Sequence, residues 1–457
     1  MLQPARRSLG GLLAAAALLA ACGPAAPSGS APASVQTTAS AEPSVGIGEV
    51  VPAPDSSSSV YAPNPGAIVV AIDPGHGGCL DWGVPDPLKR GAAFSEKAMT
   101  LAIGLELKRL LTGQGVSVVM TREADEALAG DDYPDLGCHG APFRDVNGDG
   151  ESGFDPEGKT RTRDELQARL DLVNLARADV LVSIHINSVT ENGVIVEIAL
   201  TQTYYTDETP WGVSATQHLA QFVQDGVVAA LEPVATYPRQ DRGISAVNLF
   251  IVAPPLFVTT PERPDPVKQP RRGALVPTIL TEVGSITLAA EHELLLSPEG
   301  QAAAARGIAS GLERYFADRP LAVRFDALVP GGEAGTVPTA QGEAGPPFWA
   351  TAIGSPELSR GIPVRLTNTG TAAWPAGLTV RGGWQAGDEP YLRQSPDPIR
   401  DLPIEVPPLG PGESVVVLLS EDVQAGGAGL IWITLANRDQ ALSDLGSAPL
   451  QLRTGGP

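Results

Sequence analysis

The sequence predicts an α/β domain with a mostly parallel sheet flanked by helices, followed by a smaller all-β sandwich. Strand-like and helical patterns alternate from residue 67 to about residue 318, which is typical of a parallel sheet covered by helices. Beyond about residue 320 the helical patterns end, and short apolar runs separated by Gly and Pro replace them. The chain has 457 residues, which is too long for one ordinary domain and favours this division.

The first 22 residues have the form of an export signal. Arg6 and Arg7 precede an apolar run over residues 9–21 that is too short to span a bilayer. The run ends in the letters LAAC (residues 19–22), which resemble the bacterial lipobox, where cleavage precedes a cysteine that carries a lipid. Ordinary secretion with an incidental cysteine is the alternative. We expect an extracytoplasmic protein that is lipid-anchored to a bacterial membrane through Cys22.

Composition divides the rest of the chain into three parts. Residues 23–65 are rich in Pro, Ala and Ser and have few large apolar side chains, so we expect a disordered tether. Residues 66–318 form the expected α/β domain, and residues 319–457 form the expected all-β domain. In the latter, the letters NTGTAAWP (residues 368–375) resemble a signature of immunoglobulin-like sandwiches, which indicates a fold but not a ligand.

The elements of the α/β domain are expected in a regular order. Helices are expected at residues 97–111, 162–175, 214–231 and 298–316, and strands at 67–73, 116–121, 180–187, 193–200, 248–252 and 278–284. The carboxyl ends of parallel strands share one edge of a sheet, where active sites gather. Polar residues at these ends are therefore candidates for function.

Four such side chains form a candidate zinc site. His76 follows the first strand in a glycine-rich turn, and His185 shares a strand face with other polar residues. Glu96 begins a helix, where the dipole favours a carboxylate, and Glu282 is a lone acid in a largely apolar strand. Two histidines and one carboxylate with an open position are a catalytic zinc arrangement, so we expect His76, Glu96 and His185 to bind Zn²⁺. Glu282 is then the expected acid and base.

Each of these residues also has a plainer interpretation when it is considered alone. The histidines could be ordinary hydrogen-bonded side chains, and Glu96 a helix-start acid. Glu282 could pair with an arginine such as Arg242. The placement of all four at predicted element ends favours the functional interpretation.

The sequence strings around these residues belong to a recognisable set. They read AIDPGHGG (71–78), SEK (95–97), MTREAD (120–125), SIHIN (183–187), DRGI (241–244) and TEVG (281–284), with Arg169 and Asn174 between the third and fourth. In this order they resemble zinc-dependent N-acetylmuramoyl-L-alanine amidases over nearly the whole of residues 67–318. The resemblance implies that His76, Glu96 and His185 hold zinc, that Glu282 transfers protons, and that the substrate is the amide between N-acetylmuramic acid and L-alanine of peptidoglycan.

Two other functions remain as alternatives: a zinc peptidase that acts within the stem peptide, and a catalytically silent cell-wall binding protein. The chain departs from the family pattern at Ile186, Ser285 and Leu288, which puts the pocket shape in doubt. Insertions at about 128–160 and 253–273 are expected to act as lids or substrate-selecting walls.

The first insertion contains an acidic loop. Asp145, Asn147 and Asp149 match the opening of a calcium loop, but Pro156 occupies the twelfth position, where an EF-hand has a glutamate. A looser Ca²⁺ site in the 145–157 loop and a solvated acidic turn both fit this pattern.

The remaining predictions concern charge, cysteines and histidines. A net charge of -21 argues against a nucleic-acid partner, because such partners need clustered cations. Cys79 and Cys138 permit one disulfide or two free buried thiols. His139, His218 and His292 match no motif and are predicted to lie at the surface.

Overall fold

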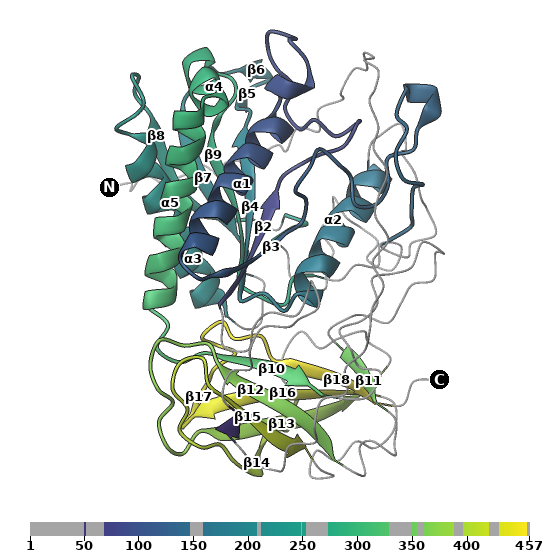
Figure 1. The fold of residues 1–457 in the computed structure, drawn as a ribbon, viewed down its shortest axis with the longest axis vertical. Coiled ribbons are helices and arrows are strands. Elements are labelled where there is room, and N and C mark those ends of the chain that lie inside the picture. Colours follow the sequence, from purple (N-terminus) through teal and green to yellow (C-terminus); the bar gives the residue numbers. More distant parts are fainter. Residues whose placement is uncertain are drawn as a thin grey trace, which may run out of the picture.

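A computed structural model of the chain contains a mixed sheet flanked by helices, followed by a C-terminal region rich in antiparallel strands (Figure 1). The predicted Cys22, most of the expected tether, Asn147, Asp149 and residues 253–272 lie outside the part that it describes. The residues described are 50–51, 68–146, 159–207, 212–247, 249–252, 273–328, 350–353, 361–387, 396–419 and 429–454. No helix among them is both long and apolar enough to cross a membrane.

The α/β domain is built on a six-stranded sheet with the order β3-β2-β4-β9-β7-β8. Its strands are β2 (Val69–Pro74), β3 (Ser117–Met120), β4 (Val180–Asn187), β7 (Leu200–Tyr205), β8 (Gln240–Ala246) and β9 (Thr278–Ser285). The strands β3, β2, β4 and β9 are parallel, whereas β7 is antiparallel to β9 and parallel to β8. The carboxyl ends of β2, β4 and β9 therefore lie at one edge, which is uppermost in Figure 1.

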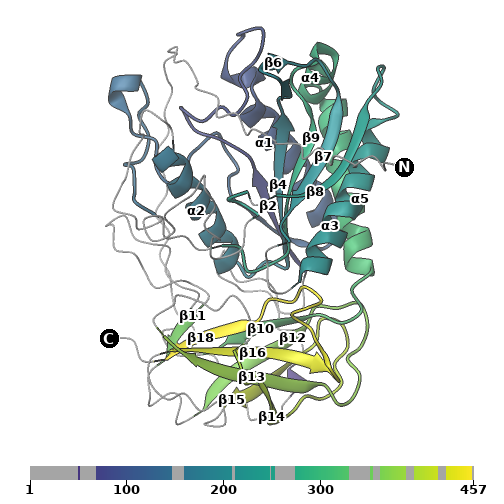
Figure 2. The same cartoon turned by 180° about the vertical axis from the view of Figure 1, so that it is seen from behind.

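Helices cover both faces of this sheet (Figures 1 and 2). The helices are α1 (Glu96–Gly113), α2 (Lys159–Leu175), α3 (Val213–Leu231), α4 (Ala289–Leu296) and α5 (Pro298–Ala317), with short 3₁₀ turns η1 (Ala92–Phe94) and η2 (Pro134–Leu136). Val70 and Ile72 of β2 pack with α1, α3 and α5 in the larger core, and Val69 and Ala71 pack with α2 in a smaller one. Alternate residues of a strand thus bury both faces, as expected for a parallel sheet.

Two predicted strands of this domain are wrong. Over residues 193–200 the chain forms a small hairpin, β5 (Thr190–Glu191) and β6 (Val194–Ile195), and the sheet strand begins only at Leu200. The apolar run 249–252 forms turns that bury Ile251 and Val252 in the smaller core. The strand that does exist, β8, lies at the sheet edge with exposed polar residues, so it lacks the apolar pattern that predicts strands.

The C-terminal domain contains two sheets, with the orders β1-β15-β12-β10 and β11-β18-β16-β13-β14, and with β17 beside β16. A shared core of buried residues includes Trp374, which is 1% exposed. The strands are β1 (Val50–Val51), β10 (Val323–Ala327), β11 (Ala350–Ile353), β12 (Ile362–Asn368), β13 (Thr379–Ala386), β14 (Arg400–Glu405), β15 (Ser414–Leu419), β16 (Gly429–Asn437), β17 (Gln440–Ala441) and β18 (Leu450–Thr454). The predicted α/β plus all-β fold class is confirmed.

Two details connect this domain to its sequence. The Asn368 side chain donates hydrogen bonds to the carbonyls of Ala372 and Leu409, both at 2.9 Å, and so shapes the turn that inserts Trp374 into the core. Val50–Val51 pairs with β15, so this part of the expected tether is a strand and not disordered.

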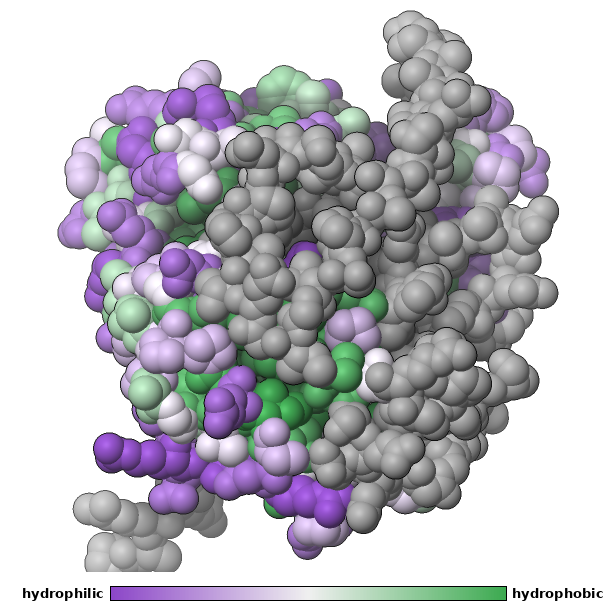
Figure 3. Space-filling view, turned by 60° about the horizontal axis from the view of Figure 1, so that its bottom comes forward, coloured by the Kyte–Doolittle hydropathy of each residue, from purple (hydrophilic) through white to green (hydrophobic). Residues whose placement is uncertain are grey.

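Figure 3 shows the molecule with the bottom of the Figure 1 view turned toward the reader. Hydrophobic residues gather near the centre of this view, and hydrophilic residues lie along its lower rim.

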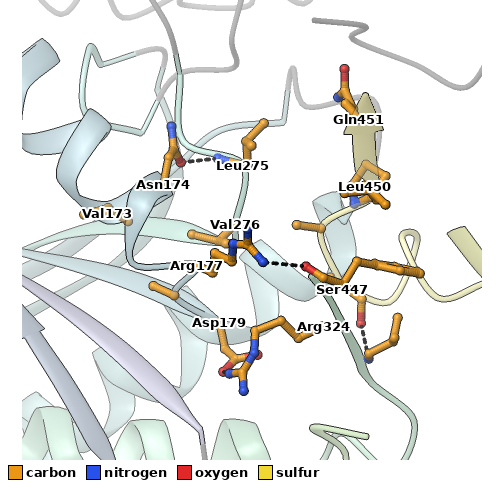
Figure 4. Close-up of a pocket in the computed structure, with 16 residues that line it drawn as sticks. Val173, Asn174, Arg177, Asp179, Leu275, Val276, Arg324, Ser447, Leu450 and Gln451 are labelled. Atoms are coloured by element: carbon orange, nitrogen blue, oxygen red, sulfur yellow. Dashed lines mark hydrogen bonds and ion pairs between the residues drawn. The ribbon is translucent and has the colours of Figure 1, made fainter. Parts of the chain in front are cut away.

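The two domains meet at the amino-end edge of the α/β sheet. Asp179, just before β4, lies 3.6 Å from Arg324 of β10, and Arg177 pairs with Asp326. Arg177, Asp179 and Arg324 border a cavity of about 90 Å³ between the domains (Figure 4). The junction therefore lies at the opposite edge from the carboxyl ends of β2, β4 and β9.

Candidate metal centre and active site

The three predicted zinc ligands lie together at the carboxyl-end edge. One ligand atom from each of His76, Glu96 and His185 lies within 4.8 Å of the others. Glu96 Oε2 is 3.2 Å from His76 Nε2, and Glu96 Oε1 is 3.0 Å from His185 Nδ1. Within the described part of the chain, this is the one group of His, Cys, Asp and Glu side chains close enough to hold a metal ion.

The backbone that carries His76 is strained and tightly held. His76 has a φ of 64°, in the left-handed region that non-glycine residues rarely occupy. Arg169 donates hydrogen bonds to the carbonyls of Pro74 at 2.8 Å and His76 at 2.6 Å. Arg122 donates to the carbonyls of Pro74 at 2.9 Å and Gly75 at 3.0 Å. Because each arginine is only 1% exposed, two buried guanidinium groups fix this turn.

Buried acids balance these arginines. Arg169 Nη1 lies 2.8 Å from Asp73 Oδ1, and Arg169 Nε donates to Glu165 at 2.9 Å. Burial alone would raise the pKa of Asp73, but Arg169 and hydrogen bonds from Thr121 and Ser183 outweigh it and lower the pKa to about 2. Asp73 is therefore ionised at neutral pH and supports the turn through Arg169.

Further groups orient the ligands. Asp81 Oδ1 lies 2.8 Å from His76 Nδ1, which leaves Nε2 as the nitrogen that faces Glu96. A carboxylate on the second ring nitrogen fixes the tautomer and the direction of a metal-binding histidine. The Glu96 oxygens accept hydrogen bonds from the backbone N–H groups of Val84 at 2.8 Å and Ile186 at 2.9 Å. Asp81 was not among the predicted site residues, because a lone acid five residues after His76 is a weak signal in the sequence.

Two glycines keep the space around the ligand atoms open. A Cβ at Gly75 would lie 2.4 Å from His185 Nε2, and a Cβ at Gly83 would lie 2.4 Å from Glu96 Oε2. Gly83 also has a φ of +65°, which favours glycine. Two histidines, one carboxylate and open space beside them are the donor set and room that catalytic Zn²⁺ requires, so these residues fit the ion.

Glu282 lies beside this group, as predicted. It is the register partner of His185 across β4 and β9, and its buried Oε2 atom has no hydrogen-bond partner within the described residues. Burial and the neighbouring Glu96 carboxylate raise the pKa of Glu282 well above its usual range, against the lowering effect of His76. The suggested ion pair with Arg242 is wrong, because Arg242 lies 3.7 Å from Glu191 instead.

A disulfide ties the first insertion to the ligand turn. Of the two alternatives for the cysteines, the structure has the Cys79–Cys138 bridge, three residues after His76. The backbone N–H of Cys79 also donates to Asp131. Part of the insertion is thereby fixed next to the turn that carries His76.

Other predictions have mixed outcomes. Asp145 is described, but Asn147 and Asp149 are not, so the calcium loop stays a prediction. His139 and His218 are exposed, as predicted. The prediction for His292 is wrong, because α4 packs against the 86–94 loop and leaves this residue 2% exposed, with Nε2 at 2.8 Å from the carbonyl of Phe94.

Comparison with known sequences identifies the family. Residues 70–314 match the profile of the family Amidase_3, described as N-acetylmuramoyl-L-alanine amidase. The match covers more than half of the chain and contains all four site residues. The chain belongs to this amidase family.

Individual relatives of the amidase are distant. It is 26% identical over 251 residues to the germination-specific N-acetylmuramoyl-L-alanine amidase of Bacillus subtilis, a match that covers 55% of this chain and 81% of the relative. It is similar to AmiC2 of Nostoc punctiforme (25% identity, 54% of this chain and 96% of that one, TM-score 0.35). It is also similar to an amidase of Clostridium difficile 630 (25% identity, 55% and 98%, TM-score 0.37). Both TM-scores are below 0.5, so the family assignment depends on the sequence match.

Proposed function

We propose that this cell-wall amidase is a zinc-dependent hydrolase that cleaves the amide between N-acetylmuramic acid and L-alanine of peptidoglycan, outside the cytoplasm. His76, Glu96 and His185 hold the Zn²⁺ ion, and Glu282 is the catalytic acid and base. The observation that supports this most directly is the convergence of three ligand atoms within 4.8 Å, next to a carboxylate whose buried oxygen has no hydrogen-bond partner among the described residues.

Residues at the carboxyl-end edge of the sheet have separate roles in the proposed amide hydrolysis. A bound Zn²⁺ would acidify water and polarise the scissile carbonyl. Glu282 takes the proton from the attacking water and gives it to the leaving amine, a role for which burial and the Glu96 carboxylate suit it because both raise its pKa. Asp81 keeps His76 in the tautomer that presents Nε2, and Arg122 and Arg169 hold the turn in place.

The two alternatives make different predictions. A catalytically silent binding protein has no use for Glu282, because a buried carboxylate beside another carboxylate lowers the stability of the fold and only catalysis gives it a function. A zinc peptidase could share the same metal group and acid, so its distinction from the amidase lies in the products. Peptides that begin with L-alanine indicate the amidase, and cuts between amino acids indicate the peptidase.

We extend the proposal to the anchor and the domains. Cys22 carries the lipid, residues 66–318 form the catalytic domain, and residues 319–457 form an immunoglobulin-like domain. Val50–Val51 pairs with β15, so the segment after Cys22 meets the protein at the end away from the metal centre. This arrangement favours a C-terminal domain that holds the active site away from the membrane. Detergent partitioning of the full chain with and without Cys22→Ser tests the anchor.

The catalytic proposal is tested on the full-length protein. Zinc content and release of L-alanine-terminated peptides from purified peptidoglycan are measured for the parent and for Glu282→Gln. We expect both proteins to bind one zinc ion, and the variant to lose about 10²–10⁴-fold in peptide release. A parent without zinc contradicts the ligand assignment, and a fully active variant contradicts the role of Glu282.

A further inference from the structure

A row of polar side chains crosses the sheet from the metal centre. His185 of β4 is the register partner of Glu282 of β9, and Glu282 is in turn the partner of Gln202 of β7. The next strand is irregular at this level: Thr201 pairs with Asp241 and Thr203 with Ile244, so Arg242 and Gly243 lie opposite Gln202. Neighbouring strands lie about 4.8 Å apart, so the backbone of Arg242 is roughly 10 Å from that of Glu282.

Side-chain contacts position the residues at the Arg242 end of this row. The Asp241 side chain accepts a hydrogen bond from Gln224 of α3 at 2.6 Å, whereas the Arg242 side chain lies 3.7 Å from Glu191 of the β5–β6 hairpin. Gln202 donates to Ser245 at 3.0 Å, and the Tyr204 hydroxyl donates to Gln202 at 3.0 Å.

The electrostatics of Tyr204 connect both ends of the row. Burial and the Glu282 carboxylate raise its pKa, and Arg242 lowers it, for a net value of about 12. Glu282 and Arg242 therefore both act on this side chain. Tyr204 stays neutral at physiological pH and can both donate and accept hydrogen bonds.

Arg242 has charge available for a ligand. Its side chain is 31% exposed, and it lies 3.7 Å from Glu191, which is 60% exposed on the β5–β6 hairpin. Such a long and exposed ion pair contributes little free energy, so an anion can replace it.

We propose that Arg242 binds a carboxylate of the stem peptide, at the second or third residue after the scissile amide, with Gln202 and Tyr204 beside the intervening peptide backbone. The inference rests on the proposed function and names a subsite for it. A distance of roughly 10 Å corresponds to about three extended residues. The stem offers carboxylates in this range, because a second residue linked through its side chain leaves its α-carboxylate free. A guanidinium recognises a carboxylate through two parallel hydrogen bonds.

Binding to a non-cleaving protein tests the subsite. The full-length Glu282→Gln protein is titrated with N-acetylmuramyl-L-alanyl-D-isoglutamate and with the isoglutamine form, whose α-carboxylate is an amide. A third probe, amidated at the second residue, carries a carboxylate on a third. We expect about tenfold tighter binding of the probe with the recognised carboxylate, and loss of this preference on Arg242→Gln. Preference for the first probe assigns the second residue, and preference for the third probe assigns the third.

Two further variants sharpen the result. Arg109→Gln removes an arginine that is 67% exposed on α1 and pairs with Glu106, and it should leave the preference unchanged. Glu191→Gln removes the competing carboxylate and should tighten binding of the preferred probe. Equal affinity for all probes, or the same preference after Arg242→Gln, overturns the subsite.

Cleavage separates this inference from the function on which it rests. In the protein with an intact Glu282, Arg242→Gln should raise KM for the carboxylate-bearing substrate and leave kcat nearly unchanged. If the parent binds the probes through Arg242 but releases no L-alanine-terminated peptide, the amidase proposal fails and the subsite stands. If the parent cleaves and Arg242→Gln changes neither KM nor binding, the subsite fails and the amidase proposal stands.

Discussion

The two edges of the α/β sheet both bury charged side chains, but the charges next to those side chains differ in sign. At the domain junction Asp179 and Arg324 have opposite charges, lie 3.6 Å apart and are 7% and 6% exposed. At the carboxyl-end edge Glu282 lies near a second carboxylate, Glu96, which raises its pKa. The buried acid at the junction thus has a cation as its partner, whereas the strongest charged neighbour of Glu282 is another carboxylate.

Whether a buried charge has an opposite charge beside it distinguishes structural from functional residues more clearly than the extent of burial does. Both edges contain buried charged side chains, and the junction also holds a cavity of about 90 Å³. A buried charge that is paired with an opposite charge holds one arrangement of the chain. A buried charge without such a pair indicates a site for a ligand or a reaction. The contrast predicts opposite responses to substitutions at the two edges.

The largest expected effect is at the junction. Asp179→Asn leaves the Arg324 guanidinium without this buried partner, so the free energy of unfolding should fall by about 3 kcal/mol. Urea unfolding of the full chain measures this loss, and zinc content and peptide release of the folded protein should not change. Asp401→Asn, in the exposed pair with Arg381, is the matched control and should change stability by less than about 0.5 kcal/mol. Loss of activity in folded Asp179→Asn would show that the two edges are not independent.

The second effect concerns metal binding. Asp81→Asn weakens the hydrogen bond that orients the His76 ring through Nδ1, so zinc affinity should fall by about 10–100-fold. Excess zinc should then restore peptide release. Competition with a chelator measures the affinity. Asp135→Asn, an exposed acid of η2, is the control. Unchanged zinc affinity in Asp81→Asn would remove Asp81 from the metal centre.

The third effect depends on pH and on the acids that balance the arginines. The folded pKa of Asp73 is lowered to about 2 from a usual value of 3.8, so its contribution is complete above about pH 4 and is lost as the pH falls toward 2. At pH 6 Asp73→Asn should be less stable than the parent by about 2 kcal/mol. Urea unfolding at several pH values should show that this difference shrinks as the pH falls. A difference that stays constant between pH 6 and pH 3 contradicts the assignment.

The sequence predicted that His76, Glu96 and His185 lie together because they lie at the ends of elements. His76, Glu96, His185 and Glu282 each have a local signal: a glycine-rich turn, a helix start, or a polar residue in an apolar strand. The order of strings such as AIDPGHGG and TEVG added the family resemblance. The fold class followed from the same alternation of patterns.

The remaining features depend on contacts that are distant in sequence. Arg169 reaches His76 across 93 residues, and the Cys79–Cys138 bridge spans 59, so neither contact has a local pattern. Asp81 has no distinguishing sequence pattern, and only the folded structure shows that it contacts His76. The edge strand β8 was missed because exposed residues carry no apolar periodicity, and Arg242 of the proposed subsite lies in it.

The smallest effect is also the sharpest test of the contrast between the edges. The raised pKa of Glu282 means that the folded protein binds a proton more tightly than the unfolded chain does, so the parent loses stability as pH rises above about 4.5. Glu282→Gln removes this penalty. In the zinc-free protein at pH 7 the variant should therefore be more stable than the parent by about 1 kcal/mol, although it is inactive.

The pH series decides between this explanation and a general effect of the substitution. The stability difference between Glu282→Gln and the parent should vanish near pH 4, where the parent carboxyl is protonated in both states. Glu299→Gln, in the first turn of α5, is the control, and should show no such gain. A zinc-free Glu282→Gln protein that is less stable than the parent at pH 7 would mean that this carboxylate has a structural partner after all. The two edges would then bury their charges in the same way, and the unbalanced charge would no longer mark the active site.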